Sequence, residues 1–208
     1  VIPSGTTLTV PEGVTLTNNG TIINNNGFTN NGTVINNGTF TNNGNLVEKN
    51  HNYTNGFCIC GEYELAEEKD GVYQIKNAGN LCWFADYVNS GHNTVNAVLT
   101  NDIDFGGRNF IAIGTSSNPY KGTFDGCGYK ITVNQSGSSD VAVFGIVQAC
   151  TIKNLTVTGT IETAVKYAAG IAMEVKSSSG AATTVENCVS DVTINSTLEG
   201  DGTHGGLV

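Results

Sequence analysis

The sequence predicts an all-β fold, built as a parallel β-helix that follows an Asn/Gly-rich β-solenoid. Three observations predict it: short β-prone repeats at the start, longer repeated strand blocks later, and a composition of few charges with 27 glycines in 208 residues. Only 13% of the residues are charged, against about 25% in an ordinary globular domain. Such a composition disfavours a helical bundle or a coiled coil, and the length allows one to two domains.

The first expected element is a set of repeats between Thr15 and Leu46. Each repeat is a short stretch rich in Thr, Ile, Val or Phe that ends in Asn-Asn-Gly or Asn-Gly, with closing glycines at Gly20, Gly27, Gly32, Gly38 and Gly44. Asn and Gly accept left-handed backbone angles at corners, and three beats, or about 18 residues, would close one coil of a solenoid with stacked Asn side chains. A meander of hairpins is the alternative, because Asn-Gly is also a strong hairpin turn.

The next expected element is an exposed connector over residues 48–70. This segment breaks the six-residue beat, contains a Cys-x-Cys turn and carries an acidic run: Glu62, Glu64, Glu67, Glu68 and Asp70. The sequence therefore predicts three parts: repeats in 1–47, this connector in 48–70, and a helix-capped β-helix in 71–208.

Residues 77–91 predict one short helix that would cap the β-helix. Apolar side chains recur at i, i+3, i+4 and i+7, which places four of them on one face: Leu81, Phe84, Ala85 and Val88. Asn77 is the expected N-cap and Gly91 the expected stop.

Strand blocks fill the rest of the chain, including 97–105, 109–114 and 122–126. Two larger blocks, 144–157 and 169–190, align with each other, and a third opens at 205–208. Such blocks with one loop each are typical of a parallel β-helix, and the open last block predicts that the natural protein continues. Aliphatic rows are expected to form its core, with members Ile146, Ile152, Leu155, Val157 and Ile171.

These blocks resemble the GLUG-motif right-handed β-helix proteins, which include IgA-protease-like and adhesin-like surface proteins of gut-type Gram-positive bacteria. The resemblance covers residues 71–208 through the ordered runs NAGNLCWFADYVNSG, AVLTNDIDFGG, GTFDGCGYKI, VFGIV, TIKNLTVTG, TVENC and GGLV. The run HNYTNGFCICG resembles a small cysteine motif found between such segments. Cys127 stands where the family often has Asn. The resemblance implies a right-handed helix and an extracellular or cell-surface location, without catalysis.

Charge and hydropathy limit the partners. The net charge of −9 disfavours nucleic acid, and no apolar run approaches the ~18 residues of a membrane span. Host or dietary glycans and surface proteins remain as expected partners, and no cofactor is expected. The six cysteines are too dilute for a disulfide-dependent fold, so most are expected to be reduced and packed in the core.

A zinc site at His51, Cys58 and Cys60 is the sharpest chemical hypothesis, because zinc takes four ligands of these types. The fourth ligand would have to come from His92, His204 or a distant cysteine. The structural alternative is a turn pinned by two small apolar side chains.

Asp102 and Asp104 form the second candidate site. On a strand their side chains would point the same way about 6.6 Å apart, a separation suited to glycoside hydrolysis or to a bound cation such as Ca²⁺. The resemblance to GLUG-motif proteins implies a structural alternative, in which this block caps and turns at the start of the β-helix.

Tyr120 and Tyr129 could stack on sugars from an exposed face, although aromatic strand residues are more often core. Nucleophile-elbow, metalloprotease and phosphate-loop motifs are absent from the sequence, and no catalytic residue is predicted. The expected function is a non-catalytic, adhesin-like surface stalk that displays binding surfaces. The alternatives are a carbohydrate-binding module and a polysaccharide-active β-helix enzyme.

Overall fold

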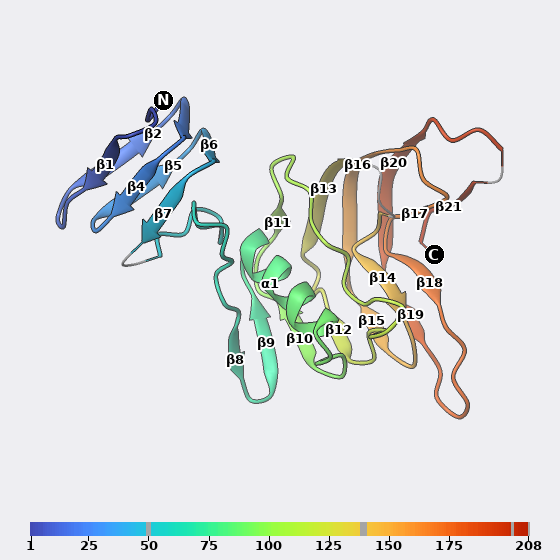
Figure 1. The fold of residues 1–208 in the computed structure, drawn as a ribbon. Helices are drawn as coiled ribbons and strands as arrows, with labels where there is room; N and C mark the ends of the chain where they lie inside the picture. Colours follow the sequence, from blue (N-terminus) through green and yellow to red (C-terminus); the bar gives the residue numbers. More distant parts are fainter. Residues whose placement is uncertain (49–50, 138–140, 201, 208) are drawn as a thin grey trace. The chain divides into compact units, whose positions relative to one another are not determined.

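The computed structural model describes residues 1–48, 51–137, 141–200 and 202–207 (Figure 1). The chain forms two compact units, unit 1 (Val1–Glu64) and unit 2 (Leu65–Val208). Short β-strands dominate both units, so the expected all-β class is confirmed. The division between the units falls inside the expected 48–70 connector, whose first part belongs to unit 1 and whose last part belongs to unit 2.

Unit 1 contains a series of four-residue strands, of which the first precedes the predicted repeats and the others follow them. They are β1 (Thr7–Val10), β2 (Thr15–Asn18), β3 (Thr21–Asn24), β4 (Gly27–Asn30), β5 (Thr33–Asn36), β6 (Thr39–Asn42) and β7 (Asn45–Glu48). Strands β1 to β4 each pair in parallel with the strand three places later, which gives the orders β1-β4-β7, β2-β5 and β3-β6. Paired residues from β2 to β7 are 18 residues apart, as the predicted period of three repeats requires, whereas β1 and β4 are offset by 20. The meander alternative is wrong for 7–48, because a meander needs antiparallel neighbours.

Asparagine side chains stack between these strands, as predicted. Asn18 Nδ2 donates to Asn36 Oδ1 and Asn24 Nδ2 donates to Asn42 Oδ1, each at 2.7 Å. These satisfied amides lie at the corners around an apolar core. The buried core side chains of unit 1 are Ile2, Val10, Phe28 and Val34.

The closing glycines have a different role from the one expected. None of them has a positive φ, so the corners do not need a left-handed residue there. Gly38 instead lies so close to Gly20 that a Cβ would overlap the Gly20 backbone. Close approach to the backbone of the preceding corner, and not backbone conformation, therefore explains the glycine at Gly32, Gly38 and Gly44.

Unit 2 begins with a hairpin in place of the acidic connector. β8 (Glu67–Lys69) pairs antiparallel with β9 (Val72–Ile75) through a turn in which Asp70 and Gly71 have φ of 53° and 79°. Two left-handed central residues are typical of a type I′ turn. The exposed charges of β8 therefore occupy a sheet edge, where they discourage pairing with other chains.

The remaining strands of unit 2 pair in parallel, over longer sequence separations than in unit 1. Side chains bonded across β13–β16 and β16–β20 are 26 and 33 residues apart. Two larger sheets have the orders β19-β15-β12-β10-β9-β8 and β11-β13-β16-β20, beside the pairs β14-β18 and β17-β21. The strands after β9 are β10 (Asn96–Leu99), β11 (Ile103–Asp104), β12 (Thr123–Asp125), β13 (Lys130–Gly137), β14 (Phe144–Val147), β15 (Thr151–Lys153), β16 (Thr156–Thr163), β17 (Tyr167–Ala169), β18 (Ala172–Val175), β19 (Thr184–Glu186), β20 (Val189–Ser196) and β21 (Thr203–Gly205).

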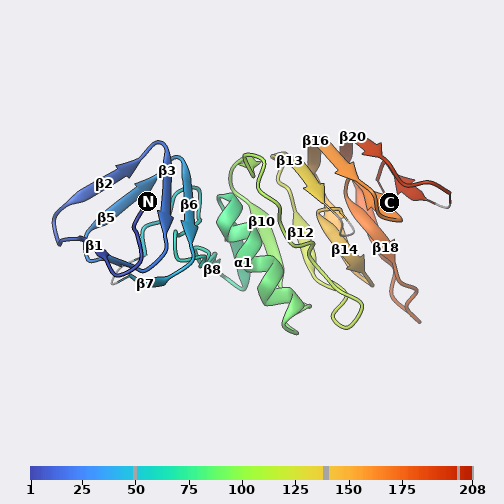
Figure 2. The same cartoon turned by 45° about the horizontal axis from the view of Figure 1, so that its top comes forward.

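The predicted helix is α1 (Ala78–Asn89). Asn77 caps it by accepting the N–H of Asn80 at 2.9 Å, and Gly91 follows with a φ of 117°. The predicted apolar face is buried: Leu81, Phe84, Ala85 and Val88. Within unit 2, α1 lies at the β9–β10 end, with β13, β16 and β20 progressively farther away (Figures 1 and 2). No helix among the described residues is long and apolar enough to span a membrane.

The core of unit 2 is partly aromatic. Phe84 packs near Phe124, which meets Phe144 edge-on at a centroid distance of 5.2 Å. The predicted aliphatic rows are buried, except that Ile146 is only half-buried. The buried members are Ile152, Leu155, Val157 and Ile171.

One expected strand and one cysteine of unit 2 differ from the expectations. The expected strand 109–114 contributes a single bridge, between Ile113 and Phe144, because the segment around it runs as a loop. Cys127 is exposed at a corner with a φ of 50°, so it is not a core residue. Cys82 and Cys150 are free and buried as expected, and burial raises their pKa values to about 12 and about 11.

The Asp125 corner gives unit 2 an expected pH dependence. Burial alone would raise the pKa of Asp125, but hydrogen bonds from Asn154 Nδ2 (2.9 Å) and the Cys127 N–H (2.8 Å), together with Lys153, bring it below its ordinary value. The folded state therefore holds the proton more weakly than the unfolded state. This contribution to stability is present above the unfolded pKa of about 3.9 and is lost as the pH falls through the folded pKa.

We expect Asp125→Asn, which retains the acceptor oxygen, to flatten the loss of stability of unit 2 as the pH falls below about 4. Urea unfolding followed by the fluorescence of Trp83, the only tryptophan of the chain, reports this unit. Asp191→Asn, at an exposed carboxylate of β20, is the control. An Asp125→Asn variant with the wild-type acid slope would contradict the assignment.

Candidate metal centre

The last segment of unit 1 is a loop held in shape by its own backbone. Asn55 and Gly56, with φ of 51° and 79°, form a two-residue turn in which Thr54 and Phe57 exchange both backbone hydrogen bonds at 3.0 Å. A second turn follows, in which the Gly61 N–H donates to the Cys58 carbonyl at 3.1 Å. Asn-Gly favours the first turn because both of its central positions are left-handed.

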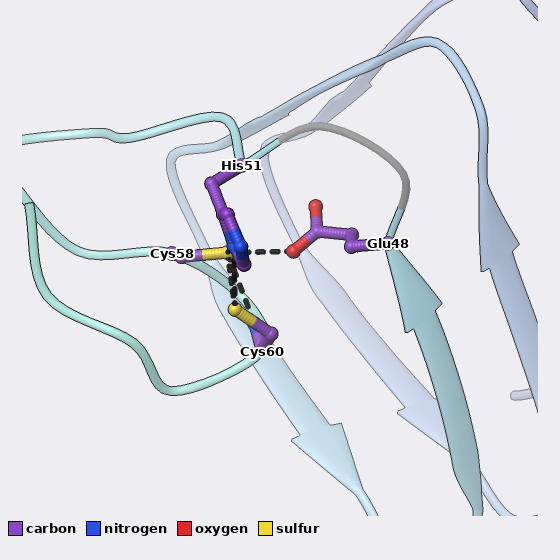
Figure 3. Close-up of side chains that lie close together, drawn as sticks. All are labelled: Glu48, His51, Cys58 and Cys60. Atoms are coloured by element: carbon purple, nitrogen blue, oxygen red, sulfur yellow. Dashed lines mark hydrogen bonds between the residues drawn. The ribbon is translucent and has the colours of Figure 1, made fainter.

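These turns bring four potential ligands together (Figure 3). Glu48 ends β7, whereas His51, Cys58 and Cys60 come from the loop. One ligand atom from each residue lies within 4.8 Å of every other. Cys58 is buried, Glu48 and Cys60 are half-buried, and His51 is exposed.

The contacts inside the cluster are short. His51 Nδ1 lies 3.6 Å from Cys58 Sγ and 3.3 Å from Cys60 Sγ. Cys58 Sγ lies 2.6 Å from both Glu48 Oε2 and Cys60 Sγ. The Cys60 N–H also points at Cys58 Sγ at 3.4 Å. The four side chains therefore face one common point.

Further side chains orient two of these groups. Glu48 Oε1 accepts from Asn30 Nδ2 at 2.9 Å, which leaves Oε2 directed at the cysteines. His51 Nε2 lies 3.3 Å from Glu62 Oε2, which leaves Nδ1 directed at the sulfurs. Outer carboxylates of this kind fix the tautomer of a metal-ligating imidazole.

The Cys58 thiol is protonated when no cation is bound. Burial raises the pKa of Cys58, and its contacts with Cys60 and Glu48 raise it further. A cation would have to displace this proton, so any metal affinity of the cluster rises with pH. Two sulfurs, an imidazole and a carboxylate are together the donor types of a tetrahedral zinc site.

The structure brings the three predicted zinc ligands together, and the fourth group is Glu48, not a distant residue. His92 and His204 both lie in unit 2, where His92 stacks on Tyr87 at 3.8 Å and His204 lies 3.3 Å from the Val165 carbonyl. One feature of the sequence points to Glu48. It lies 18 residues after Asn30, at a position where the repeat would place another stacked asparagine.

Asp102 and Asp104 do not share the strand that the predicted pairing assumed. Asp102 precedes the two-residue strand β11 and accepts the Lys130 N–H at 3.0 Å, with Lys130 Nζ at 4.0 Å. Asp104 accepts the Gly106 N–H at 2.8 Å. Both residues are exposed and bind backbone amides, which fits the turning role, and a bound cation at this pair stays a prediction.

The two tyrosines differ. Tyr120 is fully buried and its hydroxyl donates to the Val95 carbonyl at 3.0 Å, so the prediction that it stacks on sugars is wrong. Its ring fills the core beside Phe84 and Phe144. Tyr129 is 39% exposed, and its glycan contact stays a prediction.

Comparison of the chain with protein-family models, with curated proteins and with solved structures finds no match.

Proposed function

We propose that this chain is a non-catalytic stalk module of a secreted or cell-surface protein, built in both units as a right-handed parallel β-helix. The observation that carries the proposal is the strand register of unit 1, in which strands pair in parallel with partners three places later in the chain. The surface location rests on the resemblance of residues 71–208 to GLUG-motif proteins.

The register and the helix support the proposed architecture. Parallel neighbours require a crossover for every pair, and such crossovers are right-handed in about 98% of cases. The position of α1 at the β9–β10 end of unit 2 suits a cap, which solenoids need over their terminal apolar surface. The 8-residue strands β13, β16 and β20 give this unit its longest continuous ladder.

A stalk must resist extension, and the ladders supply that resistance. The strand pairs β2–β5, β3–β6 and β4–β7 are joined by backbone pairing and by a side-chain amide at the corner. In unit 2, Asn187 stacks on Asn154, which in turn donates to Asp125. Unravelling one turn of chain would break a whole row of these bonds together.

Force spectroscopy on the chain held at its two ends tests the proposal. We expect resisted steps of roughly 60 Å in unit 1, since 18 residues at about 3.3–3.6 Å each are released per turn of chain. Steps in unit 2 should be longer, because its parallel strand partners are 24 to 36 residues apart. Extension without resisted steps, as for an unstructured linker of equal length, would overturn a stalk function.

A carbohydrate-binding module is the second candidate, favoured by one surface feature. Unit 2 has an open hollow of about 470 Å³ that places apolar side chains beside hydroxyls: Phe110, Ile111, Ala112, Thr115, Ser116 and Met173. Ile111 is 53% exposed there. A glycan screen of the parent chain and of Ile111→Asp, each with and without EDTA, separates the two functions. Glycan binding that is lost in Ile111→Asp would favour the carbohydrate-binding module, and the EDTA arm shows whether that binding needs a metal.

A further inference from the structure

We propose that Glu48, His51, Cys58 and Cys60 bind one structural Zn²⁺ ion that fastens the 51–64 loop to the end strand of unit 1. This inference is independent of the proposed stalk function. It rests on the convergence of the four ligand atoms, on the groups that hold them, and on where the loop lies.

The spacing of the ligand atoms suits a small tetrahedral ion. With metal–ligand bonds of about 2.0–2.3 Å, the ligand atoms of a zinc tetrahedron lie roughly 3.3–3.8 Å apart. The two distances from His51 Nδ1 to the sulfurs, 3.6 and 3.3 Å, already fall in this range. The two 2.6 Å contacts of Cys58 Sγ must lengthen by about 1 Å, which requires small rotations of the half-buried side chains of Glu48 and Cys60.

The ligands are held in place by contacts outside the cluster. β7 pairs with β4 in register Asn30↔Glu48, and Asn30 Nδ2 fixes the carboxylate. The backbone turn that closes at Gly61 places both sulfurs on one side of the loop. Glu62 holds the far nitrogen of His51. A preorganised set of this kind loses little freedom on binding.

The donor set selects the metal. Two thiolates exclude the hard ions Mg²⁺ and Ca²⁺, which take oxygen ligands. Two sulfurs, one nitrogen and one oxygen in a compact set suit Zn²⁺, and four protein ligands leave no open position for a substrate, as in structural sites. Binding releases the thiol protons to solvent, so the ion is held by two thiolates, a neutral imidazole and a carboxylate.

The loop covers the apolar core of unit 1, which gives the ion a structural task. Ile59, between the two cysteines, packs against the cluster that contains Val10, Phe28 and Val34. Asn52 Nδ2 also donates to the Gly32 carbonyl at 3.2 Å. A zinc ion bound by Cys58 and Cys60 would keep Ile59 packed against this core. The loop would then cover the apolar end of the repeats, as capping segments do in repeat proteins.

The test uses the whole chain, purified under reducing conditions without chelator. We expect one zinc per chain by elemental analysis, and tetrahedral d–d bands with thiolate charge transfer when Co²⁺ replaces zinc. Cys58→Ser/Cys60→Ser should lower the stoichiometry to zero, whereas Cys127→Ser, an exposed cysteine of unit 2, should leave it at one.

Two milder variants keep the test valid if the double variant does not fold. Glu48→Gln keeps the acceptor for Asn30 but loses the anionic ligand, and Glu62→Gln removes only the carboxylate behind His51. We expect Glu62→Gln to weaken zinc binding by about 10- to 100-fold, as is typical of outer-shell partners, and Glu48→Gln to weaken it at least as much.

Three results would overturn the proposal. They are a reduced chain that takes up no zinc, binding that survives Cys58→Ser/Cys60→Ser, and a Cys58–Cys60 disulfide that persists when zinc is supplied with reductant. None of them alters the stepwise extension expected of a stalk, so failure of the zinc site and failure of the proposed function are distinguishable.

Discussion

Gly159→Ala is expected to lower the free energy of unfolding of unit 2 by about 3 kcal/mol. Gly159 lies inside β16, between β13 and β20, with a φ of 116°. A Cβ there would overlap the backbone carbonyl of Val133 on the neighbouring strand. Backbone strain and steric overlap therefore act together, and neither β13 nor β16 can move without disturbing the eight-residue ladder.

The matched control is Gly180→Ala. Gly180 also has a positive φ, of 91°, but a Cβ there would meet no atom within 4 Å. Its substitution isolates the conformational cost, about 1 kcal/mol. Urea unfolding followed by Trp83 fluorescence compares both variants with the parent chain. Equal destabilisation by the two substitutions would show that the close approach to Val133 does not matter.

The period of unit 1 could be predicted from sequence because it is a local property. The six-residue repeat determines where each strand starts, and a period of three repeats determines which later strand pairs with it in parallel. The reason for the glycines could not be predicted, because the contact of Gly38 with Gly20 exists only once the strands are stacked. The same limit applies to Gly159, whose neighbour Val133 is distant in sequence.

Burial was harder to predict than secondary structure in unit 2. The face of α1 followed from its 3.6-residue pattern, and Asn77 was recognisable as a cap. Tyr120 and Ile146 have no such pattern around them. Tyr120 enters the core because Phe84 and Phe144, from distant segments, close around it, whereas Ile146 borders an open hollow.

The metal-type cluster was predicted for three of its four members. His51, Cys58 and Cys60 are recognisable because His and Cys are rare in this chain and are close in sequence. Glu48 was missed because it belongs to the repeat, not to the loop that carries the other three ligands. Aligning the repeats places Glu48 at the position of Asn30, and only this alignment shows that a carboxylate replaces the usual asparagine there.

Asn24→Ala is expected to destabilise unit 1 by about 2–3 kcal/mol. Asn24 is fully buried, and its amide makes three hydrogen bonds: from Nδ2 to Asn42 Oδ1 (2.7 Å) and to the Asn45 carbonyl (3.0 Å), and from the Asn26 N–H to Oδ1 (3.2 Å). Alanine removes all three and leaves a void at the corner. Circular dichroism during urea unfolding should show an earlier transition that Trp83 fluorescence, which reports unit 2, does not follow.

Asn42→Ala tests whether burial decides the effect. Asn42 is the exposed partner of the same ladder step, and it accepts the Gly44 N–H only at 3.4 Å. Water can replace its bonds, so we expect a loss near 0.5 kcal/mol. Asn24→Asp adds a third comparison, because it keeps the acceptor for Asn26 but sets a carboxylate oxygen against Asn42 Oδ1. We expect it to be at least as harmful as alanine, since the corner needs a donor there. A variant series in which Asn24 and Asn42 cost the same would mean that the ladder stabilises unit 1 through its regularity, not through its buried amides.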